Sequence, residues 1–413
     1  MTIIKQNLLI ELGTEELPPK SLKKLSESFT QNIHDELTKA GFEFDSIAPY
    51  AAPRRLAVVV KNCAGTQPDS KVEKRGPAIS SAFDADGNPT RAAQGWAKGN
   101  GIDVTEASRL KTDKGEWLLH VAEVKGKALK DVLQEVLQTT VKKLPIPKPM
   151  RWGSSSAEFI RPVHTLCVMF GSVVLPLTLF GLTSADQLSG HRFHGQRRFT
   201  LDHADNYASA LIAQYVVADY AQRTDTIEAG LIAKAEELGL TPDYNRALLE
   251  EISSLVEWPV ILSAQFEAEF LDVPKEALIY TMKDDQKYVP LLDDEGQLSS
   301  RFLFVSNIES KDPIQVIEGN QKVIRPRLSD AKFFFENDKK TTLASKAEKL
   351  STVLFQKELG TVADKTARLV AISQIIAQEL KFDPTHVTRA AALSKADLLS
   401  DMVMEFPSVQ GVM

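Results

Sequence analysis

The residues best suited to chemistry lie within residues 283–340, where Arg325 and Arg327 flank Pro326 and the aromatic run Phe333–Phe335 follows. Each guanidinium is a planar group of donors that suits a phosphate or a carboxylate, and aromatic rings can stack on bases. Proline favours an extended conformation in the residue before it. We therefore expect both arginines to point to one side of a locally extended segment.

Two interpretations of this segment remain open. It either contacts the phosphates and bases of a nucleic acid, or it is a packed edge whose arginines pair with nearby acids. The acids closest in sequence are Glu318, Asp330 and Glu336.

Two other arginine pairs are candidates for phosphate contacts. Arg54 and Arg55 stand at the entrance to a predicted strand, where a solvated strand end is the alternative. Arg192 and Arg198 lie in a loop that also contains two histidines. A metal site would need a carboxylate or a third histidine nearby, and the positive surroundings oppose a cation. We predict a loop able to bind phosphate, with a solvated basic loop as the alternative.

Several catalytic motifs are missing from the sequence. There is no GxxxxGK[ST] phosphate loop, and Gly99 and Gly101 do not begin a dinucleotide motif because Val104 stands where the third glycine belongs. No Ser-His-Asp or paired-carboxylate set is recognisable. Cys63 and Cys167 form neither a disulfide framework nor a zinc pattern, so we expect two buried, reduced thiols.

The composition bounds the class of protein. The 413 residues are 43% apolar and 25% charged, as in globular proteins with more than one hydrophobic core. A net charge of −6 argues against a simple polybasic module, so any RNA contact must come from local basic patches. No apolar run approaches the ~20 residues that span a bilayer, and the start lacks a signal-peptide core. We expect a cytoplasmic protein without a membrane partner.

The hydrophobic periodicity predicts a multi-domain α+β fold. Residues 1–149 are expected to form an α+β domain, residues 150–330 one or more mixed β-rich and helical domains, and residues 331–413 the start of an all-helical domain. The last boundary is placed near residues 325–345. The expected strands cover residues 7–13, 56–60, 166–170, 173–180, 260–262, 287–292 and 301–308, the fourth as an edge strand or a bulged strand because of Pro176. The expected helices cover residues 18–41, 128–144, three segments within 202–257, 274–282, 332–359, 361–380 and 384–404.

Ten short motifs follow one another along the chain. They are IELGTEELPPK, APRRLAV, KRGPAISSAFDADGNPTRAAQGWAKGNG, MRWGSSSAEFIRPVH, SGHRFHG, LLEEISSLVEWPV, QKYVPL, NQKVIRPRLSDAKFFFENDKK, FQKELGTVADKTAR and KADLLSDMVMEFPSVQG. Each is weak alone, but in this order they make a specific set. Together they resemble the beta subunit of the bacterial two-subunit glycyl-tRNA synthetase over nearly the whole chain.

The resemblance implies a beta subunit of glycine–tRNA ligase that binds and positions tRNA(Gly) within an alpha-2 beta-2 tetramer. In this family the adenylate-forming core lies in the separate alpha subunit. The resemblance therefore implies no catalytic residue and no bound cofactor on this chain, whereas the holoenzyme uses ATP and Mg²⁺. The expected tRNA-binding residues are Arg325 and Arg327, with Arg54, Arg55, Arg192 and Arg198 as secondary candidates.

The resemblance also implies that residues 331–413 begin a helical domain of the HD type, and that the chain is the N-terminal part of the subunit, without the anticodon-binding domain. HD phosphohydrolases bind metal around an adjacent His-Asp pair. If Asp397 is that aspartate, Ala396 stands where the histidine belongs, so we expect no metal site. Two alternatives stay open, an HD-type phosphohydrolase and an RNA-binding scaffold without an enzymatic role.

Overall fold

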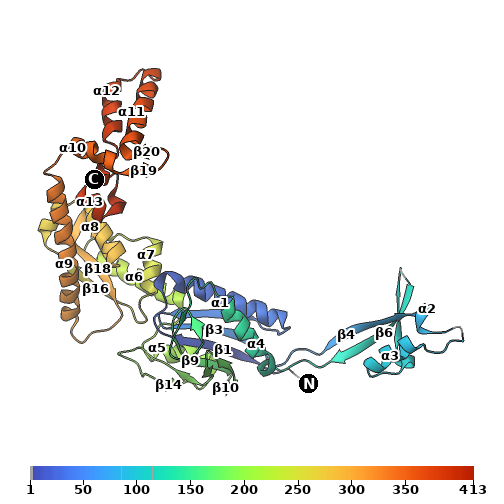
Figure 1. Cartoon of the computed structure of the whole chain (residues 1–413). Coiled ribbons are helices and arrows are strands. Elements are labelled where there is room, and N and C mark those ends of the chain that lie inside the picture. The colour runs from blue at the N-terminus through green and yellow to red at the C-terminus, as the bar shows by residue number, and fades with distance from the viewer. Residues whose placement is uncertain (1–2, 85, 114) are drawn as a thin grey trace. The chain divides into compact units, whose positions relative to one another are not determined.

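The computed structural model (Figure 1) describes residues 3–84, 86–113 and 115–413. These residues group into two compact units. Unit 1 comprises the described residues up to Leu17, Lys24–Ser189 and Arg198–Ala210. Unit 2 comprises Pro18–Lys23, Gly190–Arg197 and Leu211–Met413. Both contain helices and strands, so the expected mixed, multi-domain architecture is confirmed.

Unit 1 is built around strand β1 (Lys5–Thr14), the middle strand of an antiparallel five-stranded sheet. The sheet order is β10–β9–β1–β3–β2. The other strands are β2 (Ser46–Ala52), β3 (Arg55–Ala64), β9 (Val163–Phe170) and β10 (Val173–Val174). Leu8, Leu9 and Ile10 are all fully buried, so β1 is covered on both faces. The strands expected at residues 7–13, 56–60 and 166–170 are confirmed.

Two amphipathic helices belong wholly or mainly to unit 1, and the first of them has its initial residues up to Lys23 in unit 2. Helix α1 (Pro19–Lys39) buries the predicted stripe at three- and four-residue spacing. Its members are Leu22, Leu25, Phe29, Ile33 and Leu37. Helix α4 (Leu129–Lys142) joins α1 through a hydrogen bond from Asn32 Nδ2 to the Thr140 carbonyl at 3.1 Å. Both cysteines are buried and reduced in this unit, as expected.

A second, three-stranded sheet in unit 1 has the order β4–β6–β5. It consists of β4 (Ser70–Ala78), β6 (Gly115–Val124) and β5 (Ser108–Thr112), with helices α2 (Ile79–Ala82) and α3 (Arg91–Gly99). Trp96 on α3 packs so closely that a Cβ on Gly76 would lie 2.8 Å from its ring. The remaining two-stranded pairs are β7 (Met150–Arg151) with β8 (Glu158–Phe159), β11 (Thr178–Leu179) with β12 (Leu182–Thr183), and β13 (Gln187–Leu188) with β14 (Phe199–Thr200).

Unit 2 contains an antiparallel sheet of order β15–β17–β18–β16. Its strands are β15 (Thr241–Pro242), β16 (Val260–Gln265), β17 (Val289–Leu292) and β18 (Leu298–Ser306). The predicted hairpin is therefore confirmed as β17–β18. Its turn is held by Asp293 Oδ1, which accepts hydrogen bonds from the backbone N–H groups of Glu295 and Gln297.

The helices of unit 2 pack against its sheet in two separate hydrophobic clusters. Helices α6 (Tyr220–Glu236) and α7 (Arg246–Ser253) share a core with β17 and β18, and α8 (Lys275–Tyr280), α9 (Pro313–Asp338) and α13 (Asp401–Glu405) share another. The short helix α5 (Tyr207–Ile212) precedes them. The three helices expected within residues 202–257 are confirmed.

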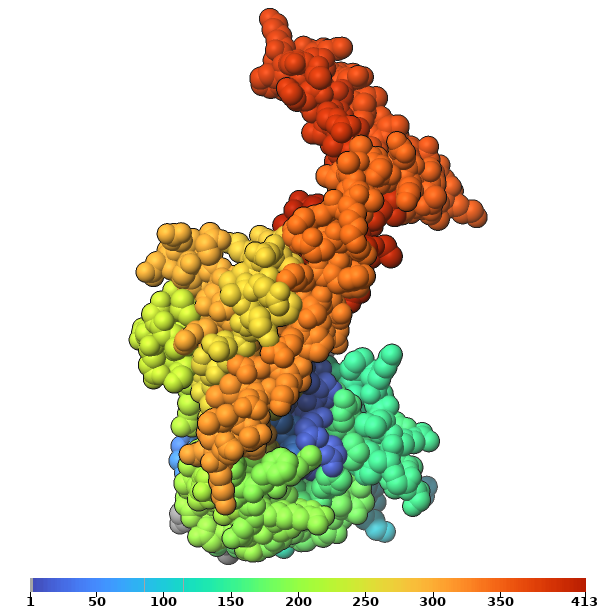
Figure 2. All heavy atoms as spheres, turned by 90° about the vertical axis from the view of Figure 1, so that its left-hand side faces the viewer, coloured from blue at the N-terminus to red at the C-terminus, as the bar shows by residue number. Residues whose placement is uncertain are grey.

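Helix α9 contradicts the expected extended segment at Arg325 and Arg327. It is continuous through Pro326. A proline inside a helix costs about 3 kcal/mol, but Ile324, Leu328 and Ala331 all face the core and are fully buried. Burying large apolar side chains stabilises by about 1.5–3 kcal/mol each, which outweighs the cost. The outer face of α9, orange in Figure 2, is exposed along its length.

The chain after α9 is not all-helical, so that prediction is wrong. The helix expected over residues 332–359 ends at Asp338, and α10 (Leu343–Glu348) and a hairpin of β19 (Leu354–Gln356) with β20 (Gly360–Thr361) follow. Gly360 has a φ of 82°, which favours this turn. Two longer helices then follow, α11 (Val362–Glu379) and α12 (Pro384–Leu393). None of the helices in the described residues has the length and apolarity needed to cross a bilayer.

Candidate functional site

The six predicted arginines are divided between the two units, with Arg54, Arg55 and Arg198 in unit 1 and Arg192, Arg325 and Arg327 in unit 2. Arg325 forms an ion pair with Glu267, and neither of these side chains is buried. The partner is thus none of the three acids expected from the sequence. Residues two apart on a helix point in different directions, so Arg325 and exposed Arg327 cannot share one partner as an extended segment would allow.

Arg55 is a structural residue and not a phosphate contact. It is 1% exposed, and its Nη1 donates to Glu11 Oε2 at 3.1 Å while its Nη2 donates to the Ser189 carbonyl at 2.6 Å. The hydroxyl of Tyr207 donates to the same Glu11 oxygen at 2.6 Å. Burial, together with the charge of Glu11, raises the pKa of Tyr207 well above its usual value. The prediction for Arg55 is therefore wrong, because no phosphate can reach it. Arg54 is partly exposed and remains a candidate.

Arg192 and Arg198 are both exposed but belong to different units. Arg198 Nη2 donates to the His164 carbonyl at 3.3 Å, at the edge of a cavity of about 280 Å³ in unit 1. Arg192 lies in the segment Gly190–Arg197 of unit 2. The phosphate-binding role of these two residues stays a prediction.

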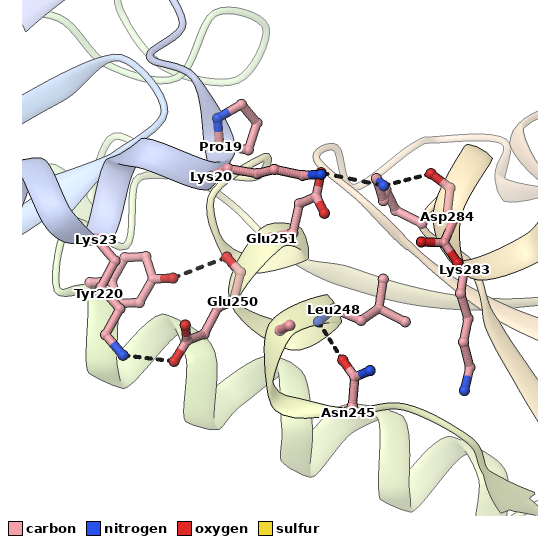
Figure 3. Close-up of a pocket in the computed structure, with 12 residues that line it drawn as sticks. Pro19, Lys20, Lys23, Tyr220, Asn245, Leu248, Glu250, Glu251, Lys283 and Asp284 are labelled. Carbon is pink, nitrogen blue, oxygen red and sulfur yellow. Dashed lines mark hydrogen bonds and ion pairs between the residues drawn. The ribbon is translucent and has the colours of Figure 1, made fainter. Parts of the chain in front are cut away.

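A pocket in unit 2 has a volume of about 430 Å³ and is lined by four lysines (Figure 3). Lys20 and Lys23 come from the first turns of α1, and Lys283 and Lys287 come from the segment after α8. Helix α7 contributes Leu248, Glu250 and Glu251, and Asn245 caps that helix by accepting from the Leu248 N–H at 2.9 Å. Residues more than 200 positions apart therefore meet around one cavity.

Carboxylates hold three of these ammonium groups in place. Lys23 Nζ lies 2.7 Å from Glu250 Oε1, and Lys287 Nζ lies 3.3 Å from Glu251 Oε1. Lys283 Nζ lies 2.6 Å from Asp243 Oδ1. The hydrogen bond from Lys23, with a further one from Arg246, lowers the pKa of Glu250. These pairs fix the positions of cations that border the pocket.

The backbone beside the pocket has an unusual conformation. Thr281–Asp285 forms a π-helical turn, and Lys287 has a left-handed φ of 59°. Lys287 Nζ donates to the Asp284 carbonyl at 2.6 Å, which closes this turn. A π-helical turn and a left-handed non-glycine residue are both costly and are found preferentially at functional sites.

The chemistry of the lining favours binding over catalysis. Ammonium groups can accept a phosphate, and the neighbouring carboxylates can accept hydrogen bonds from sugar hydroxyls. The lining residues include no serine, cysteine or histidine that would serve as a nucleophile with its base. None of the residues that line this pocket was among the site residues predicted from the sequence. Its only local signal was the spacing of Lys20 with Lys23 and of Lys283 with Lys287.

No cluster of three or more histidine, cysteine, aspartate or glutamate side chains suited to a metal occurs in the described part of the chain. Asp397 is buried, and its Oδ2 accepts from the Gly411 N–H at 2.6 Å. Ala396 beside it is fully buried. The carboxylate of Asp397 thus serves as the hydrogen-bond acceptor for the backbone N–H of Gly411.

Comparison with known proteins gives one consistent result. The family model described as "Glycyl-tRNA synthetase beta subunit" matches residues 8–413. The chain is 62% identical over 408 residues to a protein of Alteromonas mediterranea named "Glycine--tRNA ligase beta subunit". Proteins of the same name from Pseudoalteromonas atlantica and Shewanella halifaxensis are 55% and 56% identical. Each alignment covers 99% of this chain but only 59% of the relative's own length.

Proposed function

Because the chain belongs to the glycyl-tRNA synthetase beta subunit family, we propose that it binds and positions tRNA(Gly) for ATP-dependent attachment of glycine. The observation that carries this proposal is the match over residues 8–413. The lysine-lined pocket supports it, since its lining suits phosphate binding and includes no serine, cysteine or histidine.

The partners in this proposal are tRNA(Gly) and the alpha subunit of glycine–tRNA ligase, in an alpha-2 beta-2 tetramer in the cytoplasm. The alpha subunit forms the glycyl-adenylate with ATP and Mg²⁺, and this chain holds no cofactor. Its contribution to rate is positional, because correct placement of reactants can supply about 7–11 kcal/mol of a barrier. Residues 331–413 would be a structural or tRNA-contacting part related to HD domains.

The test compares the pure chain with the chain plus alpha subunit. We expect salt-sensitive tRNA binding in a filter assay, no glycine-dependent pyrophosphate exchange by the chain alone, and faster glycyl-tRNA formation when the chain is added to alpha. Pyrophosphate exchange by the chain free of alpha would overturn the division of labour.

The same assays separate the two alternatives. An RNA-binding scaffold would bind tRNA without affecting glycyl-tRNA formation. An HD-type phosphohydrolase would release product from nucleotide or tRNA without any partner, and the described residues offer it no metal cluster.

A further inference from the structure

The segment Gly190–Arg197 of unit 2 is a closed, tightly packed loop. Gly190 N–H donates to the Gln196 carbonyl, Gly195 N–H to the His191 carbonyl, and His191 N–H to the Gln214 carbonyl, each at 2.9 Å. A Cβ on Gly195 would lie 2.6 Å from the Gln214 carbonyl oxygen, so only glycine fits there. The loop is therefore held in one conformation against residue 214.

Inside this loop, a buried histidine fixes the direction of an exposed phenylalanine. His191 is fully buried, and its Nδ1 accepts from the backbone N–H groups of Phe193 and His194, each at 3.2 Å. Because Nδ1 accepts both bonds, the ring proton belongs on Nε2. Phe193, at the end of this anchored turn, is 74% exposed.

A continuous row of aromatic rings begins at this loop. His191 stacks on His194 with centroids 5.0 Å apart, His194 lies 5.2 Å from Tyr215, and Tyr215 lies 5.3 Å from Trp258. All four residues belong to unit 2. Tyr215 is 39% exposed and has a left-handed φ of 60°. Such a conformation is costly for an aromatic residue and points to a functional constraint.

Positive charge borders the exposed ring. Arg192 directly precedes Phe193, and exposed Arg197 ends the same loop. Exposed aromatic side chains between guanidinium groups are the chemistry that binds unpaired nucleotides, because bases stack on the rings and phosphates pair with the cations. A protein-docking patch would instead need a contiguous apolar surface, and the loop presents one large apolar side chain between charged ones.

We propose that Phe193, with the adjoining row of rings and the flanking arginines, is a stacking site for unpaired nucleotides of the bound RNA. This inference rests on the proposed tRNA-binding function and specifies which part of an RNA this surface takes. A base stacks on Phe193, the loop arginines contact the adjacent phosphates, and base-paired segments are excluded because their faces are already stacked.

The test uses three substitutions at one position. Phe193→Ala and Phe193→Leu are expected to weaken tRNA(Gly) binding roughly 5- to 150-fold, the range for one lost stacking contact, while Phe193→Trp keeps or strengthens it. Binding is measured by filter assay with the alpha subunit present. Leu271→Ala, which removes an exposed apolar side chain from a part of unit 2 outside residues 331–413, is the control and leaves affinity unchanged.

A second measurement tests whether the bound nucleotides are unpaired. The new indole fluorescence of Phe193→Trp, taken as the difference from the wild type, is quenched by a short single-stranded RNA and not by a duplex of the same sequence. Arg197→Gln lowers the salt slope by about one, whereas the Phe193 variants leave the slope unchanged.

The possible failures are distinct. Unchanged affinity in Phe193→Ala overturns the stacking site and leaves the proposed function standing. Full affinity in Phe193→Leu shows that no π face is needed, which also overturns it. Loss of alpha binding in Phe193→Ala, with tRNA affinity intact, assigns the loop to a protein partner instead. Absence of tRNA binding by the wild type with alpha removes the proposed function and this site with it.

Discussion

Arg55 on β3 donates to Glu11 on β1 inside the sheet of unit 1, at 3.1 Å, and both side chains are 1% exposed. A buried charge that loses its partner is costly. We expect Arg55→Met to lower the free energy of unfolding by about 3–5 kcal/mol, because it leaves the Glu11 carboxylate uncompensated.

The double variant Arg55→Met/Glu11→Leu, which removes both charges, should recover a large part of this loss. Urea denaturation of the wild type, both single variants and the double variant measures the coupling. Strictly additive effects would contradict the pairing.

Asp338 gives a prediction about pH. Burial acts to raise its pKa, but the hydrogen bond from Lys346 and the backbone N–H groups of Met402 and Asp401 outweigh it, so its pKa lies below the usual value. Its stabilising contribution is therefore complete above the unfolded pKa of about 3.9 and is lost as pH falls through the lower folded pKa.

We expect Asp338→Asn to destabilise the protein by about 1–3 kcal/mol at pH 7, with the difference from the wild type shrinking below about pH 4. Thermal melts over this pH range measure it. Asp330→Asn changes an exposed carboxylate on the same helix and is the control. A difference independent of pH would refute the assignment.

Because α9 is helical, Arg325 and Arg327 point in different directions, and separate outcomes are expected for substitutions of the two residues. The Arg325–Glu267 pair is partly exposed, at 60% and 39%, so its loss should change stability by less than about 1 kcal/mol. Arg327→Ala is expected to weaken tRNA binding and lower the salt slope by about one, with an unchanged melting temperature.

The double variant Arg325→Glu/Glu267→Arg keeps the ion pair but exchanges the positions of the positive and the negative charge. If Arg325 only fastens α9, the swap behaves like the wild type in tRNA binding. If Arg325 contacts phosphate, affinity falls. Full tRNA affinity in folded Arg327→Ala would end the RNA-contact role of that residue.

Lys287 lines the pocket and also has a strained backbone conformation. Its φ of 59° suits glycine and costs roughly 1–2 kcal/mol for another residue. Lys287→Gly relieves this cost while losing the pair with Glu251, so it should be more stable than Lys287→Ala by about 1 kcal/mol. Both variants should bind tRNA equally weakly. A glycine variant less stable than the alanine variant would contradict the backbone argument.

Metal removal is expected to leave the protein unchanged. Asp397 is engaged by the Gly411 N–H, and Ala396 cannot bind a cation. Dialysis against a chelator should not shift the melting temperature. A stoichiometric metal found by elemental analysis, and lost in Asp397→Ala, would disprove this expectation.

Elements set by local pattern could be predicted from the sequence. The stripe of Leu22, Phe29 and Ile33 predicted α1, and Asp293 with Gly296 predicted the β17–β18 turn, because both depend on residues close in sequence. Pro326 misled the prediction, because the buried neighbours of α9 outweigh the local preference of proline.

The site residues could not be predicted in the same way. In the sequence, Arg55 cannot be told from a surface charge, because its partner Glu11 lies 44 residues earlier. The lysine-lined pocket joins Lys23 to Glu250 across 227 residues. Such contacts depend on the tertiary fold, and a single sequence gives no spacing rule for them.

The central position of β1 has a consequence for synthesis of the chain. Its partner β3 follows soon after, but Glu11 pairs with Cys167 on β9, 156 residues later. At about 5–20 residues per second, roughly 8–30 s pass before β9 is made. After β3 is made and until β9 follows, the pair of strands β1 and β3 has an open apolar edge, which pairs readily with other strands. We therefore expect this part of the chain to depend on ribosome-associated chaperones.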